Sequence, residues 1–223
     1  MNPGLPLAPL RAAIVDLDGT MVDTLGDFAV ALNRTLDELR LPGIDRATIE
    51  RLVGKGSEHL VRSVLSHVGA APQQYDAAWE GYQRHYLAIN GDYSDVYPGV
   101  VEGLTLLKER GLRLACLTNK PTGFALPLLR AKRLEGFFSV VFGGDAFERK
   151  KPDPLPLVKT CEVLASLPGE TLMIGDSSND AAAARAAGCP VVLVSYGYNH
   201  GQPVPSDDAD GYIDSLAQLR ELL

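Results

Sequence analysis

The chain has few cysteines and no long apolar run, and each scarcity excludes a class of protein. Its three cysteines lie far apart and lack the spacing of metal ligands or of a disulfide framework: Cys116, Cys161 and Cys189. A small, odd number of cysteines indicates free thiols in a reducing compartment, so we expect a cytoplasmic protein. No segment approaches the roughly 20 apolar residues that a membrane span needs. Residues 1–9 also lack the basic start and apolar stretch of a signal peptide.

Positive charge is in short supply as well. The 28 acidic side chains outnumber the 21 Lys and Arg, which gives a net charge of −7 at pH 7. This balance argues weakly against a nucleic-acid or anionic-membrane partner, because neither would be attracted at long range. It leaves room for a small anionic substrate, since a local cluster of cations can outweigh the overall field. The 223 residues, 46% hydrophobic and 22% charged, predict a folded globule with one large domain or a core plus a small domain.

One stretch near the N-terminus organises the rest of the chain. Residues 12–15 (Ala-Ala-Ile-Val) predict a short buried strand, and the carboxylates of Asp16 and Asp18 follow it. Alternate residues of an extended chain point the same way, so both carboxylates reach toward one spot. Their repulsion favours a metal site or an acid/base pair, and Gly19 allows a turn or a close approach of the backbone to a ligand. A plain Asp/Gly turn is the alternative, and a calcium loop fits poorly because residues 20–22 are Thr-Met-Val.

The segment from residue 24 to about residue 90 has the apolar spacing of helices. Apolar residues recur every three or four positions over 25–39, 49–52, 60–68 and 72–90. The last of these helices carries an aromatic stripe made of Tyr75, Trp79, Tyr82 and Tyr86. The stripe could be a wall for a substrate, but its spacing is what packing requires, so we favour the core of a small bundle. The sequence therefore predicts an all-helical insertion.

Strand and helix patterns alternate from residue 100 onward, after a polar segment over 91–99 that is a plausible hinge. The pattern predicts strands over 113–117, 140–142, 171–174 and 191–194, helices over 100–109, 122–131, 155–164, 178–187 and 216–223, and a surface loop over 202–208. Such alternation is typical of a parallel sheet with helices on both faces, whose ligands bind beyond the carboxyl ends of the strands. Five polar residues fall at those ends and predict one site: Asp16, Asp18, Thr118, Asn119 and Asp176.

The residue types at this predicted site suit phosphate chemistry with a hard metal ion. Three of them offer carboxylate oxygens with no His or Cys nearby, a donor set that Mg²⁺ prefers: Asp16, Asp18 and Asp176. Thr118 and Asn119 offer a hydroxyl, an amide and backbone N–H groups to phosphoryl oxygens. Lys151 could neutralise charge on a phosphoryl group or on a neighbouring carboxylate, although a solvated loop lysine is the alternative.

Four motifs, in chain order, resemble those of the haloacid dehalogenase superfamily. They are Asp16-Leu17-Asp18-Gly19-Thr20, Leu117-Thr118-Asn119, Lys151-Pro152-Asp153-Pro154 and Gly175-Asp176-Ser177-Ser178-Asn179-Asp180. Shorter stretches resemble its phosphoglycolate phosphatase branch, among them Tyr97-Pro98-Gly99-Val100, Thr118-Asn119-Lys120 and Ser195-Tyr196-Gly197-Tyr198. The resemblance implies a Rossmann-like, doubly wound α/β core over 1–20 and 94–223, with the helical cap of that superfamily inserted over 21–93.

The resemblance also implies a phosphatase mechanism. Asp16 would attack phosphorus to form an aspartyl-phosphate, and Asp18 would protonate the leaving oxygen and then activate water. Mg²⁺ would be held by the Asp16 carboxylate, the Asp18 main-chain carbonyl and Asp176. Superfamily dehalogenases lack the second aspartate, so halide displacement is disfavoured here.

The same resemblance assigns the residues around these aspartates. Gly19, Thr118, Asn119 and Lys151 would bind the substrate, with Thr118 and Lys151 holding the phosphoryl oxygens and counting among the catalytic residues. Asp180 would orient a metal-bound water or Lys151. Its alternative role is that of an acid favoured at a helix N-terminus.

The choice of substrate would come from the cap. Lys55, His59 and Arg62 would share one basic helix face if the helix starts at Gly56, and we expect Lys55 and Arg62 to bind a substrate carboxylate. An exposed basic face is the alternative. Lys55 also lies broadly where a related phosphonate hydrolase carries a Schiff-base lysine, but its neighbours do not support that role. A P-loop is discounted because the first glycine of that motif is missing upstream of Gly54-Lys55.

The leading functional hypothesis is therefore a Mg²⁺-dependent phosphatase for 2-phosphoglycolate, a small phosphorylated metabolite, acting as a monomer or homodimer. A β-phosphoglucomutase, a pyrophosphatase, a sugar- or nucleotide-phosphate phosphatase and a phosphonate hydrolase remain alternatives on the same fold. A non-catalytic phosphate- or metal-binding regulatory module is the alternative of another class. Such a module would need no general acid at Asp18.

Overall fold

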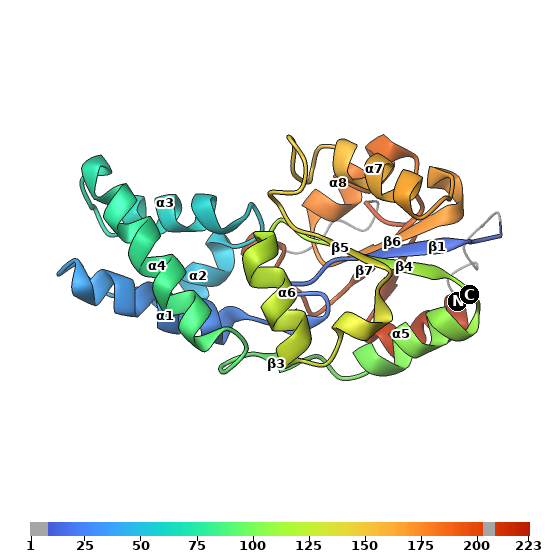
Figure 1. Ribbon diagram of the computed structural model, residues 1–223, viewed down its shortest axis with the longest axis horizontal. Coiled ribbons are helices and arrows are strands. Elements are labelled where there is room, and N and C mark those ends of the chain that lie inside the picture. The colour runs from blue at the N-terminus through green and yellow to red at the C-terminus, as the bar shows by residue number, and fades with distance from the viewer. Residues whose placement is uncertain (1–8, 203–207) are drawn as a thin grey trace.

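The computed structural model of the protein describes residues 9–202 and 208–223 (Figure 1). Two expectations thus concern segments almost wholly outside the described residues: the missing signal peptide over 1–9 and the surface loop over 202–208. Within the described ranges, every helix is too short or too polar to cross a membrane.

A parallel sheet forms the centre of the larger part of the molecule. Within the described residues its strands are β1 (Ala12–Val15), β4 (Arg113–Leu117), β5 (Val140–Phe142), β6 (Thr171–Gly175), β7 (Val191–Val194) and β8 (Gly211–Ile213). The order is β5-β4-β1-β6-β7-β8, and each neighbouring pair is parallel. From β1 the chain adds β4 and β5 on one side, and then β6, β7 and β8 on the other. Sheets of this kind bind ligands where the direction reverses, at the carboxyl ends of the central strands.

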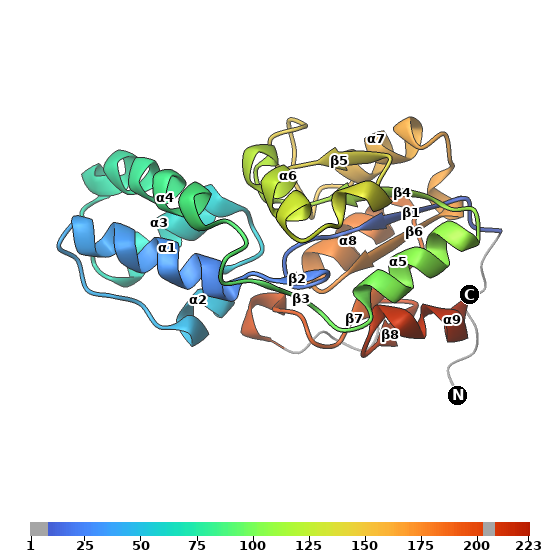
Figure 2. The ribbon, with the colours of Figure 1, turned by 60° about the horizontal axis from the view of Figure 1, so that its bottom comes forward.

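Helices cover both faces of the sheet (Figures 1 and 2). They are α5 (Val100–Glu109), α6 (Thr122–Ala131), α7 (Leu155–Val163), α8 (Ser178–Ala187) and α9 (Leu219–Leu222). Ala12 and Ile14 of β1 pack in one apolar cluster with α7 and α8, and Ala13 and Val15 pack in another with α5, α6 and α9. Because successive strand residues point to opposite faces, β1 contributes to both layers, and the α/β doubly wound prediction is confirmed.

Four further helices form a helical cap beside the sheet, at the left of Figures 1 and 2. They are α1 (Leu25–Glu38), α2 (Arg46–Leu52), α3 (Ser57–His67) and α4 (Tyr75–Ile89). Tyr82 and Tyr86 are fully buried in the apolar cluster of the cap, whereas Tyr75 and Trp79 pack at its edge. The aromatic stripe is therefore core, as favoured from its spacing. The domain limits at 20/21 and 93/94 stay a prediction.

Two chain segments connect the cap to the sheet. They pair as a short antiparallel ribbon of β2 (Val22–Asp23) and β3 (Asp95–Val96). The buried carboxylate of Asp27 in α1 holds the returning segment, because it accepts the N–H groups of Gly91 and Tyr93, each at 2.8 Å. The Ser94 hydroxyl donates to the same carboxylate.

The limits of the elements depart from the sequence pattern in a few places, for local reasons. The helix expected over 72–90 opens with a 3₁₀ turn at Pro72–Gln74, and the terminal helix expected over 216–223 opens with one at Leu216–Gln218. The pattern does not predict β2, β3 or β8, because strands of two or three residues are too short to show a period of two.

Candidate active site

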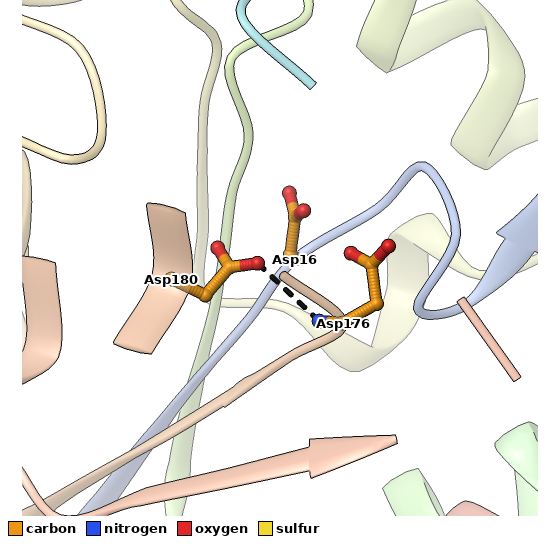
Figure 3. Close-up of side chains that lie close together, drawn as sticks. All are labelled: Asp16, Asp176 and Asp180. Carbon is orange, nitrogen blue, oxygen red and sulfur yellow. Dashed lines mark hydrogen bonds between the residues drawn. The ribbon is translucent and has the colours of Figure 1, made fainter. Parts of the chain in front are cut away.

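Three aspartates meet at the carboxyl ends of β1 and β6. Asp16 follows β1, whereas Asp176 follows β6 and Asp180 lies in the first turn of α8. Figure 3 shows their carboxylates grouped together, and one oxygen of each lies within 4.8 Å of the others. All three residues are buried. The sheet thus unites segments that are about 160 positions apart in the sequence, as the sequence pattern predicts for Asp16 and Asp176.

The turn after β1 requires glycine at position 19. Gly19 has a φ of +82°, and a Cβ added there would lie 2.5 Å from Oδ2 of Asp176. Its N–H donates to the Val22 carbonyl at 2.9 Å, which closes the turn. Gly19 is not among the residues that line the pocket described below, so its substrate contact stays a prediction.

The aspartates destabilise one another in their charged forms. Burial raises the pKa of Asp16 to about 7, the Lys151 ammonium opposes this rise, and Asp180 adds to it. Burial, followed by the carboxylates of Asp180 and Asp16, raises the pKa of Asp176 well above its ordinary value. Additional positive charge at this point would therefore be strongly stabilising.

The donor atoms fit a hard divalent metal ion. Oδ1 of Asp16 is buried and makes no hydrogen bond, although Nζ of Lys151 lies 3.0 Å away as an ion pair. Asp176 is oriented by the Thr20 hydroxyl at 3.1 Å and by the Tyr198 N–H at 2.8 Å. Among the described residues, the donor atoms grouped here are all carboxylate oxygens, a set that could hold such an ion.

Lys151 is part of this site and not a surface lysine. Its residue is 4% exposed, and Nζ lies 2.7 Å from Oδ1 of Asp180 and 2.9 Å from the Leu117 carbonyl. Burial alone would lower the pKa of Lys151, but the carboxylates of Asp16 and Asp180 outweigh burial and raise it. The alternative of a solvated loop lysine is therefore wrong.

Asp180 combines the two roles considered for it. Its Oδ1 binds Lys151, while its Oδ2 accepts the Ser177 hydroxyl at 2.8 Å and the Ser177 N–H at 3.2 Å at the start of α8. The same oxygen accepts the Asp176 N–H at 3.3 Å, the dashed line in Figure 3. Asp180 therefore orients Lys151 and also caps the helix. Whether it touches a metal ion stays a prediction.

A pocket opens above these residues, between the sheet and the cap. The predicted site residues that line it are Asp16, Asp18, Thr118, Asn119, Lys151, Asp176 and Asp180. The cap contributes Phe28 from α1 and the segment from Val53 to Ser57 with the exception of Lys55. The amide of Asn119 is already bonded, because Nδ2 donates to the Gly54 carbonyl at 3.0 Å and to the Lys151 carbonyl at 2.9 Å. Asn119 therefore ties the cap to the sheet.

The basic residues of the cap lie away from this pocket. Lys55, His59 and Arg62 are exposed, and none of them lines it. Lys55 precedes α3, and the Arg62 guanidinium lies 3.4 Å from the centroid of the Tyr75 ring. Their exposure fits the alternative interpretation, an exposed basic helix face. Substrate binding by Lys55 and Arg62 stays a prediction without structural support.

Sequence reasoning missed several residues that line the pocket, among them Lys120 and His200. Lys120 pairs with Asp18, with Nζ 2.8 Å from Oδ1. His200 lies with Nδ1 2.7 Å from the Val53 carbonyl, which joins the segment after β7 to the cap. The Thr118-Asn119-Lys120 motif contains the signal for Lys120, whereas nothing near His200 in the sequence indicates its contact.

The clustered carboxylates predict that the metal-free protein loses stability as the pH rises. Between the unfolded pKa of 3.8 and the folded pKa of about 7, Asp16 binds more protons in the folded state, so the free energy of unfolding falls across this window. Lys151 keeps its proton throughout the window, because its raised pKa lies far above it. In a chelator we expect the Tm to be lower at pH 8 than at pH 5 by on the order of 5 °C.

Thermal unfolding at both pH values checks this expectation, with Asp16→Asn as the control. The variant should show a smaller drop, and a divalent cation should raise the Tm of the wild type at pH 8. A wild-type Tm that is equal or higher at pH 8 in chelator would contradict the prediction.

Comparisons with known proteins find relatives that match nearly the whole chain. The chain is 44% identical to the phosphoglycolate phosphatase of Thiobacillus denitrificans over 213 residues, which cover 94% of each chain. It is also 44% identical to that of Nitrosospira multiformis over 218 residues, 96% of each chain.

Solved structures with this fold include a predicted phosphoglycolate phosphatase from Haemophilus somnus. It has a TM-score of 0.90 at 31% identity, covering 96% of this chain and 97% of that one. CbbY from Rhodobacter sphaeroides, in complex with phosphate, has a TM-score of 0.81 at 25% identity, covering 94% and 96%. Residues 13–194 match the family of haloacid dehalogenase-like hydrolases. The chain belongs to this family and is a hydrolase.

Proposed function

We propose that this hydrolase is a Mg²⁺-dependent phosphatase that converts 2-phosphoglycolate and water to glycolate and phosphate. The observation that carries the proposal is the pairing of Asp16 with Lys151 at 3.0 Å in a pocket that also holds Asp18 and Thr118. The relatives at 44% identity over nearly the whole chain carry this activity in their names, which supports the choice of substrate.

Mg²⁺ would be held by the carboxylates of Asp16 and Asp176 together with the main-chain carbonyl of Asp18. When bound, the ion supplies positive charge that lets a phosphate dianion approach the anionic nucleophile. The raised pKa values of Asp16 and Asp176 support the need for such a charge.

The residues of the chain would perform two displacements at phosphorus. The Asp16 carboxylate attacks phosphorus, the bond from phosphorus to the glycolate oxygen breaks, and Asp18 donates a proton to that oxygen. Asp18 then takes a proton from a water that attacks the aspartyl-phosphate, which releases phosphate and regenerates Asp16. Lys151 and the Thr118 hydroxyl hold the phosphoryl oxygens throughout, so catalysis depends mainly on position and charge.

The alternatives on this fold differ in what they release. A β-phosphoglucomutase would isomerise a sugar phosphate without releasing phosphate, and a pyrophosphatase, a phosphonate hydrolase or a sugar- or nucleotide-phosphate phosphatase would prefer another compound. A regulatory module would release nothing. The combination of Asp16, Asp18 and Lys151 in one pocket argues against the module. The cytoplasmic location and the monomeric or homodimeric state stay predictions.

Phosphate release from a panel of phosphorylated compounds tests the proposal. The panel contains 2-phosphoglycolate, glucose 1-phosphate, pyrophosphate, a nucleotide and a phosphonate, each assayed with Mg²⁺ and with a chelator. We expect kcat/KM for 2-phosphoglycolate to exceed the others by at least about 10-fold and to disappear in chelator. Similar activity toward all of the compounds would support a phosphatase mechanism but contradict the assignment of 2-phosphoglycolate as the substrate. Undiminished activity in chelator would contradict the requirement for Mg²⁺.

A further inference from the structure

A second buried lysine lies in the pocket, outside the mechanism proposed above. The side chain of Lys120, on the segment after β4, is 1% exposed, and its Nζ lies 2.8 Å from Oδ1 and 3.1 Å from Oδ2 of Asp18. In the described part of the chain, no other hydrogen bond reaches the Asp18 carboxylate. A single ammonium group therefore determines how this carboxylate is oriented.

The cap places two aromatic rings near that ammonium. Nζ of Lys120 lies 4.5 Å from the ring centroid of Phe28 in α1 and 4.8 Å from that of Tyr86 in α4. The two rings stack on each other with centroids 5.6 Å apart, and both residues are buried. Aromatic faces attract a cation at these distances and keep water away from it. Without the two rings, the flexible side chain of Lys120 would be free to adopt other rotamers, in which its ammonium lies away from Asp18.

The position of Asp18 makes this arrangement relevant to the reaction. A carboxyl group that protonates a leaving oxygen must lie within hydrogen-bond reach of it, and a misplacement of about 1 Å can lower the rate about 10²-fold. Lys120 belongs to the sheet side of the pocket and its aromatic neighbours here belong to the cap. The ammonium therefore connects the orientation of the acid to the packing of the cap.

We propose that Lys120 is a positioning residue that aligns the Asp18 carboxylate with the leaving oxygen, and that Phe28 and Tyr86 hold Lys120 in place from the cap. The inference rests on the proposed function, since it takes Asp18 as the acid. It adds that the acid is aligned only while Phe28 of α1 and Tyr86 of α4 lie against Lys120, so the cap acts on the chemistry as well as on access.

Single-turnover measurements with enzyme in excess test this role in Lys120→Met. Two leaving groups are compared in the presence of Mg²⁺: glycolate, whose oxygen needs a proton to depart, and p-nitrophenolate, which departs as a stable anion. We expect the release of glycolate to fall about 10²-fold and the release of p-nitrophenolate to fall less than about 5-fold. The ratio of the two rates in one preparation does not depend on the folded fraction, so partial unfolding cannot mimic the result. Equal losses, or no loss, would overturn the proposal.

Two variants, one in the cap helix α1 and one in α6 of the sheet domain, test the part played by the rings. Phe28→Leu removes an aromatic face from Lys120, whereas Phe124→Leu makes the same change at a buried ring that lies 5.0 Å from Tyr86 and does not line the pocket. We expect the ratio of glycolate to p-nitrophenolate release to fall about 3- to 10-fold in Phe28→Leu and to stay within about 2-fold in Phe124→Leu. Equal changes in the two variants would show that the rings act only through packing.

The variant Asp18→Asn separates this inference from the proposed function. If wild type does not turn over 2-phosphoglycolate, or if Asp18→Asn does not discriminate between the two leaving groups, the proposed function itself fails. If Asp18→Asn discriminates and Lys120→Met does not, only the role of Lys120 is rejected.

Discussion

Asp16→Asn is expected to abolish phosphate release while leaving the protein folded. The amide cannot attack phosphorus, so kcat for 2-phosphoglycolate should fall by about 10⁴-fold or more. Stability should survive, because burial already raises the pKa of Asp16 to about 7 and the site therefore tolerates an uncharged group of the same shape. Phosphate release and thermal unfolding, measured on the same preparation, check both halves of the prediction.

Asp27→Asn is the matched control. Asp27 is also buried, but it lies in the cap, where its carboxylate accepts the N–H groups of Gly91 and Tyr93. The amide can accept fewer of these bonds, so we expect a loss of about 1–3 kcal/mol of stability with kcat within about 3-fold of wild type. If Asp16→Asn retained turnover, or lost it only in proportion to unfolded protein, Asp16 would not be the nucleophile.

The convergence of Asp16 and Asp176 could be predicted from the sequence, because both residues follow strands of one parallel sheet. Once residues 12–15 are recognised as a buried parallel strand, Asp16 must lie at its carboxyl end, and the same holds for Asp176 after β6. The end of this strand has little freedom, because a shift along the sheet would bring the Asp16 carboxylate into the apolar layers that cover both faces. The role of Lys151 is harder to predict from the sequence. A loop lysine is usually solvated, and only the folded structure shows that this one is buried beside Asp16 and Asp180.

Contacts between the cap and the sheet could not be predicted in the same way. Helical spacing identifies which side chains face the interior of the cap, but it does not show how the cap packs against the sheet domain. Lys55 and Arg62 illustrate this limit, since their spacing fits a basic face and the structure turns them to solvent. Lys120 shows the opposite case: its partners Asp18, Phe28 and Tyr86 come from three separate segments, and only the assembled structure unites them.

Lys151→Met is expected to damage both stability and activity, because it removes the positive charge from a buried acidic cluster. Asp16 and Asp180 would each lose an ion pair, at 3.0 Å and 2.7 Å, and breaking a buried pair from one side lowers stability by about 3–5 kcal/mol. The loss should be greater at pH 8 than at pH 5, since Asp16, with a pKa of about 7 beside Lys151, is already protonated at the lower pH. Loss of a group that stabilises the phosphoryl oxygens should reduce kcat by about 10²- to 10³-fold in the fraction that folds.

Lys150, the preceding residue, is the control, since it carries the same ammonium group in a more exposed environment. The side chain of Lys150 is 34% exposed, and its Nζ lies 3.5 Å from Oε2 of Glu58 at the surface. Such pairs contribute little, so Lys150→Met should change stability by less than about 0.5–1 kcal/mol and kcat by less than about 3-fold. Chemical denaturation at the two pH values, together with phosphate release at saturating substrate, measures all of these quantities. Similar losses in the two variants, or a Lys151→Met defect independent of pH, would mean that Lys151 does not balance the charge of the aspartates, and the electrostatic basis of the proposed mechanism would fall with it.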